Sequence, residues 1–153
     1  SVSHCDFPDN GMDSVALREV AGRIEDTVRR TGPTIVYTHH FGDLNVDHRL
    51  ACEATMVACR PHPDSCVRAI YGFEVLSSTD WAASHVSKFI PNVFTDISDF
   101  IDQKLEVLNV YRFEMRQEPH SRSFAHVRAL ATHRGHHVGV SAAEAFCLYR
   151  LLK

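Results

Sequence analysis

The apolar positions near the start of the chain follow helical spacing. Four of them recur on one helical face: Val15, Val20, Ile24 and Val28. This pattern predicts a helix that Asp13 or Ser14 caps and that runs to about Arg30. We expect Gly32-Pro33 to end it.

Further along, strand-like and helix-like segments alternate. We predict strands over residues 34–38, 67–75 and 92–97, and helices over residues 47–59, 98–115 and 123–134. Ser98 or Asp99 would cap the second of these helices. Residues 144–152 fit a strand or a helix, and we favour a strand. The alternation predicts an α/β fold, Rossmann-like with three layers and a mainly parallel sheet, in a single domain over residues 1–153.

Composition excludes several classes of protein. The chain has 153 residues and a formal net charge of −3, so it has no basic excess for binding nucleic acid or an anionic membrane. No apolar run approaches the roughly 20 residues that span a bilayer. The five cysteines form no C-x-x-C pair, and the start does not resemble a signal peptide. We therefore expect a cytoplasmic protein with reduced thiols and no partner of nucleic acid or membrane.

The candidate chemistry is concentrated in residues 38–49, which read Thr-His-His-Phe-Gly-Asp-Leu-Asn-Val-Asp-His-Arg. The histidines and aspartates lie in a loop between a predicted strand and a predicted helix. Ligands of parallel α/β sheets collect at the carboxyl ends of strands, which is where this loop lies. The structural alternative is a polar loop whose aspartates cap the helix and whose histidines bond to backbone.

This run resembles the second motif of the PIG-L/LmbE-like zinc-dependent de-N-acetylases, a family that removes acetyl groups from N-acetylated sugars and related amides. Other segments resemble further parts of the family in the same order: residues 7–13, 60–61, 73–79, 119–123, 134–135, 138–139 and 143–146. The resemblance covers essentially the whole chain. It implies zinc as cofactor and an N-acetyl sugar or sugar conjugate as substrate.

The resemblance also implies roles for individual residues. His48 is similar to a zinc ligand of the family, and Asp47 beside it would orient groups of the site. Asn45 stands where some members carry a histidine, and its amide can donate a hydrogen bond to an oxyanion. Asp47 and Asn45 are therefore the candidate catalytic residues, and His48 is the candidate metal ligand. The candidate substrate-binding residues are Arg49, His120 and Arg122, and for Arg122 a structural ion pair is an equal alternative.

The first motif of the family, an Ala-His-Pro-Asp-Asp-like run that supplies two zinc ligands and the general base, has no counterpart before residue 7. Pro61-His62-Pro63-Asp64-Ser65 is similar only superficially, because it precedes a predicted strand and Ser65 replaces the second aspartate. We expect the chain to correspond to the C-terminal two-thirds of the family fold, truncated at the N-terminus. A catalytic zinc needs about three protein ligands, so we expect the isolated chain to be inactive.

One further consequence and two alternatives follow from this expectation. A missing central strand would leave an apolar sheet surface open, which predicts a homo-oligomer that covers it. The chain could instead be a non-catalytic remnant of the family that acts as a binding or interaction module. It could also be a fragment whose first motif is supplied by another polypeptide.

Overall fold

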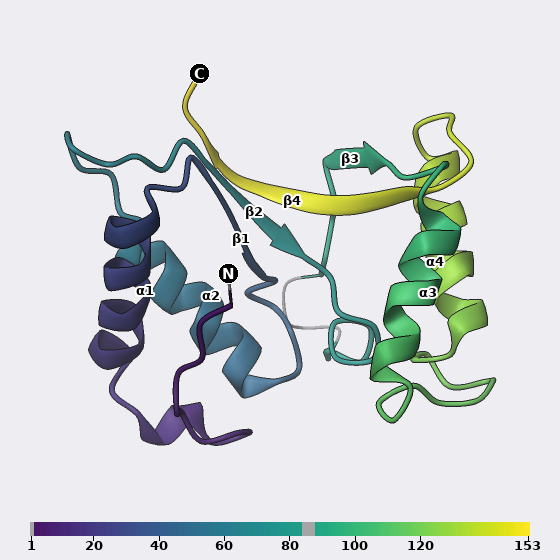
Figure 1. Ribbon diagram of the computed structural model, residues 1–153, viewed down its shortest axis with the longest axis horizontal. Coiled ribbons are helices and arrows are strands. Elements are labelled where there is room, and N and C mark those ends of the chain that lie inside the picture. The colour runs from purple at the N-terminus through teal and green to yellow at the C-terminus, as the bar shows by residue number, and fades with distance from the viewer. Residues whose placement is uncertain (1, 84–87) are drawn as a thin grey trace. The chain divides into compact units, whose positions relative to one another are not determined.

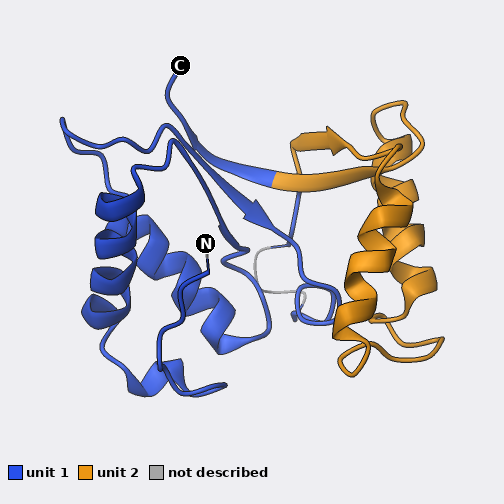
Figure 2. Cartoon of the chain, in the orientation of Figure 1, with its two compact units in different colours: residues 1–90, 147–153 blue, residues 91–146 orange. Residues whose placement is uncertain are grey.

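The computed structural model describes residues 2–83 and 88–153, which form two compact units. Unit 1 comprises residues 1–90 and 147–153, and unit 2 comprises residues 91–146 (Figure 2). The last strand of the chain contributes residues to both units. Each unit is therefore described by itself, and the prediction of a single domain over residues 1–153 stays a prediction.

Unit 1 contains two α-helices, a short 3-10 helix, a pair of parallel strands and the end of a third strand (Figure 1). Its elements are η1 (Met12–Ser14), α1 (Leu17–Thr31), β1 (Ile35–His39), α2 (Val46–Ala58), β2 (Ala69–Phe73) and the end of β4 (Ala143–Leu151). The strands β1 and β2 pair in parallel, from Ile35 beside Ala69 to His39 beside Phe73. Both strands therefore end at the same edge of the sheet, and that edge carries the loops described below.

Alternation along β1 explains which face of it is covered. Val36 packs with Val28 of α1 against the buried cluster of Cys59, Val67 and Ile70. Side chains of successive strand residues point to opposite faces, so Ile35 and Tyr37 point the other way. These two side chains are about half exposed, at 49% and 54%. The helical layer of unit 1 thus covers the Val36 face of β1.

Unit 2 is a helical pair packed on a strand pair. Its elements are β3 (Val93–Asp96), α3 (Ile101–Leu108), η2 (Asn109–Tyr111), α4 (Phe124–His136) and the start of β4. Strands β3 and β4 are antiparallel, with Val93 beside Phe146. Ile97, Ala131 and Ala142 form its buried cluster, and Ile101 packs against them.

The α/β class is confirmed, but the sheet is mixed rather than mainly parallel. The strand order is β1-β2-β4-β3, with β1 and β2 parallel and β3 and β4 antiparallel. The connections explain the difference. A single helix, α2, joins β1 to β2 and returns the chain to the starting end of the sheet, as a parallel pair needs. Two helices, α3 and α4, join β3 to β4, and the second helix reverses the direction again.

The expected elements are present, including the strand at residues 143–151, but two helix starts were wrong. The N-cap of α1 is Ala16, because residues 12–14 form a short 3-10 turn in which the Ser14 hydroxyl donates to the Gly11 carbonyl. The helix α3 begins after Phe100 and ends at Leu108, well before residue 115. The Ser98 hydroxyl donates to Asp96 instead of capping α3. Among the described residues, no helix is both long enough and apolar enough to cross a bilayer.

Two helical glycines give a matched test of the packing. A Cβ on Gly135 of α4 would lie 2.7 Å from backbone atoms of Ala142 and Val140, whereas a Cβ on Gly22 of α1 would have no neighbour within 4 Å among the described residues. We expect Gly135→Ala to destabilise the protein by about 1–3 kcal/mol through overpacking. We expect Gly22→Ala to stabilise it by about 0.5–1 kcal/mol through helix propensity. Urea unfolding followed by circular dichroism measures both, and shifts of the same sign would contradict the packing described here.

Candidate functional site

The loops that follow β1 and β2 lie together at the carboxyl edge of the parallel pair. The backbone N–H of Leu44, in the first loop, donates to the carbonyl of Ser78, in the second, at 3.0 Å. The predicted site residues from Asn45 to Arg49 come directly after the first loop, at the start of α2. The sequence-predicted segment is therefore held against a second loop, in which no residue was named as a site residue.

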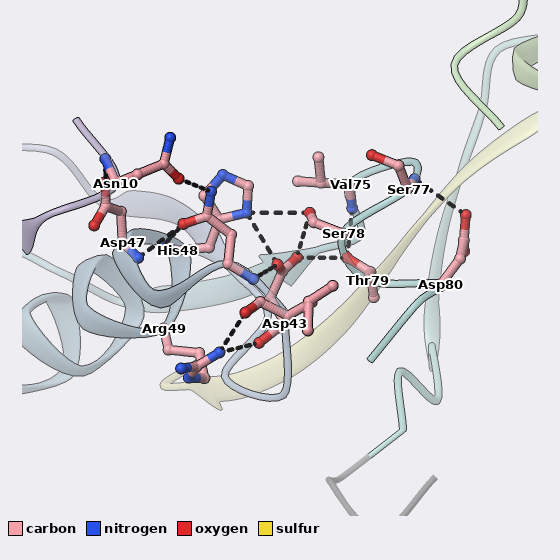
Figure 3. A network of polar contacts seen from close by, with 12 residues as sticks. Asn10, Asp43, Asp47, His48, Arg49, Val75, Ser77, Ser78, Thr79 and Asp80 are labelled. Carbon is pink, nitrogen blue, oxygen red and sulfur yellow. Dashed lines mark hydrogen bonds and ion pairs between the residues drawn. The ribbon is translucent and has the colours of Figure 1, made fainter. Parts of the chain in front are cut away.

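Asp43 is the centre of the polar contacts between these loops (Figure 3). Its side chain is almost fully buried, with the residue 1% exposed. Its Oδ1 accepts the backbone N–H of Asn45 at 2.8 Å, and its Oδ2 accepts the hydroxyls of Ser78 and Thr79 at 3.0 and 2.8 Å. Its Oδ1 also lies 3.2 Å from Nδ1 of His48.

These contacts decide the charge of Asp43. Burial by itself would raise the pKa of the carboxyl group, but hydrogen bonds from His48, the Asn45 backbone, Thr79 and Ser78 oppose it. The hydrogen bonds together have the larger effect, and the pKa of Asp43 falls from 3.8 to about 2. Asp43 is therefore a carboxylate at neutral pH.

His48 lies in the first turn of α2 and faces this carboxylate. Besides Asp43, its Nδ1 has the hydroxyl oxygen of Ser78 at 3.3 Å. One face of its ring stacks on His39, with ring centroids 4.0 Å apart and planes 15° from parallel. The side chain keeps 22% of its surface exposed. The ring is thus held on one edge and one face while part of it reaches solvent.

His39, the last residue of β1, is held as a neutral base. Burial is the main reason that its pKa falls from 6.5 to about 4, and charge on His48 lowers it too, while Asp43 opposes the change. Its ring also lies against Phe73, with centroids 4.7 Å apart. A neutral His39 stacked on His48 adds no positive charge to the site at neutral pH.

The two candidate catalytic residues make structural contacts. The Asn45 Oδ1 caps α2 by accepting the backbone N–H groups of Asp47 at 2.8 Å and His48 at 3.4 Å. The Asp47 carboxylate accepts the backbone N–H groups of Asn10 at 2.6 Å and Met12 at 3.0 Å. The cap of α2 is thus Asn45 and not an aspartate, as the structural alternative for the loop had it, and the catalytic roles of Asn45 and Asp47 stay predictions.

The three candidate substrate-binding residues lie in different units. In unit 1, Arg49 donates from Nη1 to the carbonyls of Asp43 and Leu44, both at 2.7 Å, and so braces the first loop. In unit 2, the backbone N–H of Arg122 donates to Nδ1 of His120 at 2.9 Å. The Arg122 guanidinium lies 3.4 Å from Glu114, the ion pair that was the alternative for this residue. Their substrate-binding roles stay predictions.

The imidazole of His48 is a type of ligand that zinc binds, so His48 fits one position of a zinc site. Metal-bound histidines commonly donate their other ring N–H to a carboxylate, which is the position Asp43 occupies. The buried ring of His40 has its Nδ1 3.1 Å from the Tyr149 hydroxyl. Within residues 2–83 and 88–153, no group of three His, Cys, Asp or Glu side chains is placed to hold a metal ion. Among the described residues, His48 therefore suits one ligand position of a zinc site, and the remaining ligands are not supplied.

Sequence reasoning missed Asp43, Ser78 and Thr79 as members of the site. Asp43 lay inside the motif, but its sequence position alone did not distinguish it from Asp47. Ser78 and Thr79 lie more than 30 residues away, and only the parallel pairing of β1 and β2 brings their loop to Asp43. A rule that pairs the loops after adjacent parallel strands would have found them.

The fold and this site together define a class: an α/β protein with a histidine–carboxylate pair at the carboxyl ends of parallel strands. A family model described as PIG-L, GlcNAc-PI de-N-acetylase, matches residues 1–59. The uncharacterized deacetylase YaiS of Escherichia coli is 29% identical over 115 residues, which are 71% of this chain and 55% of that protein. These matches support the resemblance of this chain to the PIG-L-like de-N-acetylases.

Two solved structures share the fold. The conserved protein TT1542 from Thermus thermophilus matches with a TM-score of 0.71 and 22% identity, over 96% of this chain and 64% of that one. The N,N'-diacetylchitobiose deacetylase from Pyrococcus horikoshii matches with a TM-score of 0.69 and 17% identity, over 94% of this chain and 55% of that one. At these identities the matches establish the fold and leave the reaction open. The chain spans about half the length of the curated relative that it matches.

Because His39 is neutral in the folded protein, we expect the protein to lose stability in mild acid. Its folded pKa lies below its ordinary value of 6.5, so the unfolded chain takes up the proton first as pH falls. The stabilisation is complete above pH 6.5 and is lost as pH falls toward 4. Allowing for partial exposure, we expect His39 to account for a loss of about 1–2 kcal/mol between about pH 7 and pH 5.

Urea unfolding of the wild type and of His39→Gln at the two pH values measures this contribution. The variant has no titrating ring at this position, so its stability should fall less than that of the wild type. The exposed His62, in the same unit, supplies the control His62→Ala, which should follow the wild type. Equal losses in the wild type and His39→Gln would contradict the prediction.

Proposed function

We propose that this chain contributes the histidine ligand of a zinc-dependent de-N-acetylase that acts on an N-acetylated sugar or sugar conjugate. The observation that carries the proposal is the contact of His48 Nδ1 with the buried Asp43 carboxylate, at 3.2 Å. Carboxylates in this position support histidine ligands of zinc. The similarity of the chain to the PIG-L family model and to a deacetylase supports the reaction class.

The substrate class is proposed from the same relationships. The matching family model is described by the de-N-acetylation of GlcNAc-PI, and one solved structure of the same fold is a diacetylchitobiose deacetylase. Both descriptions name N-acetylated sugars. Since those descriptions belong to other proteins, the sugar of this protein and any group attached to it are open to assay.

We further propose that the 153-residue chain by itself does not turn over substrate. In the part of the chain that the structure describes, no three potential ligands come together, and a catalytic zinc ordinarily has about three protein ligands. Activity then needs ligands in addition to His48. A non-catalytic binding module is the second candidate function, and the same observation favours it.

The proposal is tested by zinc content and acetate release. The protein should be prepared as its natural gene encodes it, freed of loosely bound metal, and assayed with N-acetylglucosamine conjugates. Zinc binding and acetate release should both be lost in His48→Ala, because a histidine ligand is removed. His62→Ala removes an exposed histidine of the same unit and should retain both.

The isolated 153-residue chain supplies the second arm of this experiment. We expect it to release no acetate, and release that depends on His48 would overturn the proposal of an incomplete ligand set. Zinc binding and acetate release that survive His48→Ala in the gene-encoded protein would overturn the assignment of His48. A gene-encoded protein that binds the N-acetyl sugar without zinc or turnover would favour the binding module.

We also propose that the protein is a homo-oligomer in the cytoplasm. β1 is at an edge of the strand order, and Ile35 and Tyr37 on it are about half exposed, which makes this edge suited to strand addition. All five cysteines are free thiols in the structure, which suits a reducing compartment. Sedimentation equilibrium at micromolar concentration should give a dimer or larger species, and a Tyr37→Lys variant should shift it toward monomer. A wild-type monomer at that concentration would contradict the proposal.

A further inference from the structure

Among the residues that the structure describes, two protein groups lie within hydrogen-bonding distance of the His48 Nδ1 atom. They are Oδ1 of Asp43 at 3.2 Å and Oγ of Ser78 at 3.3 Å, on the side of the ring marked by dashed lines in Figure 3. The Ser78 hydroxyl itself donates to Oδ2 of Asp43 at 3.0 Å. Because a hydroxyl has a single hydrogen, Ser78 then offers His48 a lone pair and no hydrogen.

The contacts of Asp43 exclude the other potential donor. Its Oδ1 accepts the Asn45 N–H and its Oδ2 accepts the hydroxyls of Ser78 and Thr79, so both oxygens act as acceptors. Both neighbours of Nδ1 are therefore acceptors. A neutral His48 with its hydrogen on Nε2 would instead point the Nδ1 lone pair at a carboxylate oxygen 3.2 Å away, which is electrostatically unfavourable.

The carboxylate is also fixed in orientation. The Asn45 backbone N–H holds Oδ1 at 2.8 Å, and the Thr79 hydroxyl holds Oδ2 at 2.8 Å. The stacked His39 ring, 4.0 Å away, fixes the plane of His48. Because the Asp43 carboxylate and the plane of the His48 ring are both held in place, one position of the ring hydrogen is favourable, and that position is Nδ1.

We propose that Asp43 is the positioning residue of His48: it accepts the Nδ1 hydrogen, fixes the ring in that tautomer, and leaves the Nε2 lone pair available to an electrophile. For the zinc ion of the proposed function, this makes Nε2 the donor atom and strengthens it as a ligand. That last step rests on the proposed function, whereas the tautomer does not. The motif resemblance assigned this orienting role to Asp47, whose carboxylate binds Asn10 and Met12 instead.

Nitrogen NMR of the histidine rings measures the tautomer directly. Spectra of the 15N-labelled protein are recorded without metal or substrate at about pH 8, where an ordinary imidazole is neutral. The His48 signals are assigned by their loss in His48→Ala. We expect a hydrogen-bearing Nδ1 and a hydrogen-free Nε2 in the wild type.

Three alanine variants separate the groups around the ring. Asp43→Ala removes the carboxylate, so the two tautomers should mix and the Nδ1–H signal should weaken severalfold. Ser78→Ala removes the other neighbour of Nδ1 but leaves the carboxylate, so the Nδ1–H tautomer should persist. Asp47→Ala is the matched control for an aspartate at the same helix start, and it should also retain the wild-type pattern.

A wild-type His48 with its hydrogen on Nε2 would overturn the proposal without any variant. A folded Asp43→Ala that keeps the Nδ1–H tautomer would overturn it, as would its loss in Ser78→Ala. If Asp43→Ala does not fold, the wild-type and Ser78→Ala spectra still decide. Because no metal or substrate is present, this result is independent of the zinc and acetate assays, and either proposal can fail alone.

Discussion

The Asp43 carboxylate is almost fully buried, and a charge removed from water is costly unless hydrogen bonds replace its hydration. Three donors on two separate loops supply them: the Asn45 backbone and the hydroxyls of Ser78 and Thr79. His48 completes the shell. The two loops have to bring these groups together to form the site. The arrangement of both loops therefore depends on hydrogen bonding to the Asp43 carboxylate.

The loop that supplies the Ser78 and Thr79 hydroxyls to Asp43 is held in shape by hydrogen bonds of its own. The second loop is a tight turn in which the Val75 N–H donates to the Thr79 hydroxyl at 2.7 Å and the Ser77 N–H donates to Asp80 at 3.3 Å (Figure 3). Ser77 adopts a left-handed backbone, with φ of 77°. A non-glycine residue rarely takes this conformation, and its cost has to be offset by surrounding contacts. The turn that brings Ser78 and Thr79 to Asp43 is thus stabilised from both sides, by its own hydrogen bonds and by the carboxylate.

The elements were predictable from the sequence because each of them repeats a local pattern. The helix over residues 46–58 and the strand over residues 35–39 agree closely with the expected ranges, since β-branched runs and apolar spacing act within a few residues. The early start and long extent expected for the helix at 101–108 were wrong, because Ser98 bonds to Asp96 rather than to the helix. The mixed sheet was not predicted either. Its antiparallel pair follows from two helices in succession between β3 and β4, and spacing along the chain does not reveal which strands become neighbours.

The site was predictable only in part, for the same reason. The motif correctly predicted that His48 and Asn45 lie at the start of a helix that follows a strand, because that arrangement depends on a local pattern of consecutive residues. The motif did not show which of two aspartates, Asp43 or Asp47, contacts His48. Asp47 adjoins His48 in sequence, but on a helix adjacent residues point in directions about 100° apart, so their side chains diverge. Asp43 is five residues earlier, yet the loop turns back and brings its carboxylate to Nδ1. In this site, sequence adjacency does not show which carboxylate orients the helical histidine. The carboxylate that contacts it lies in the preceding loop, where donors from the loop after a neighbouring strand bury it.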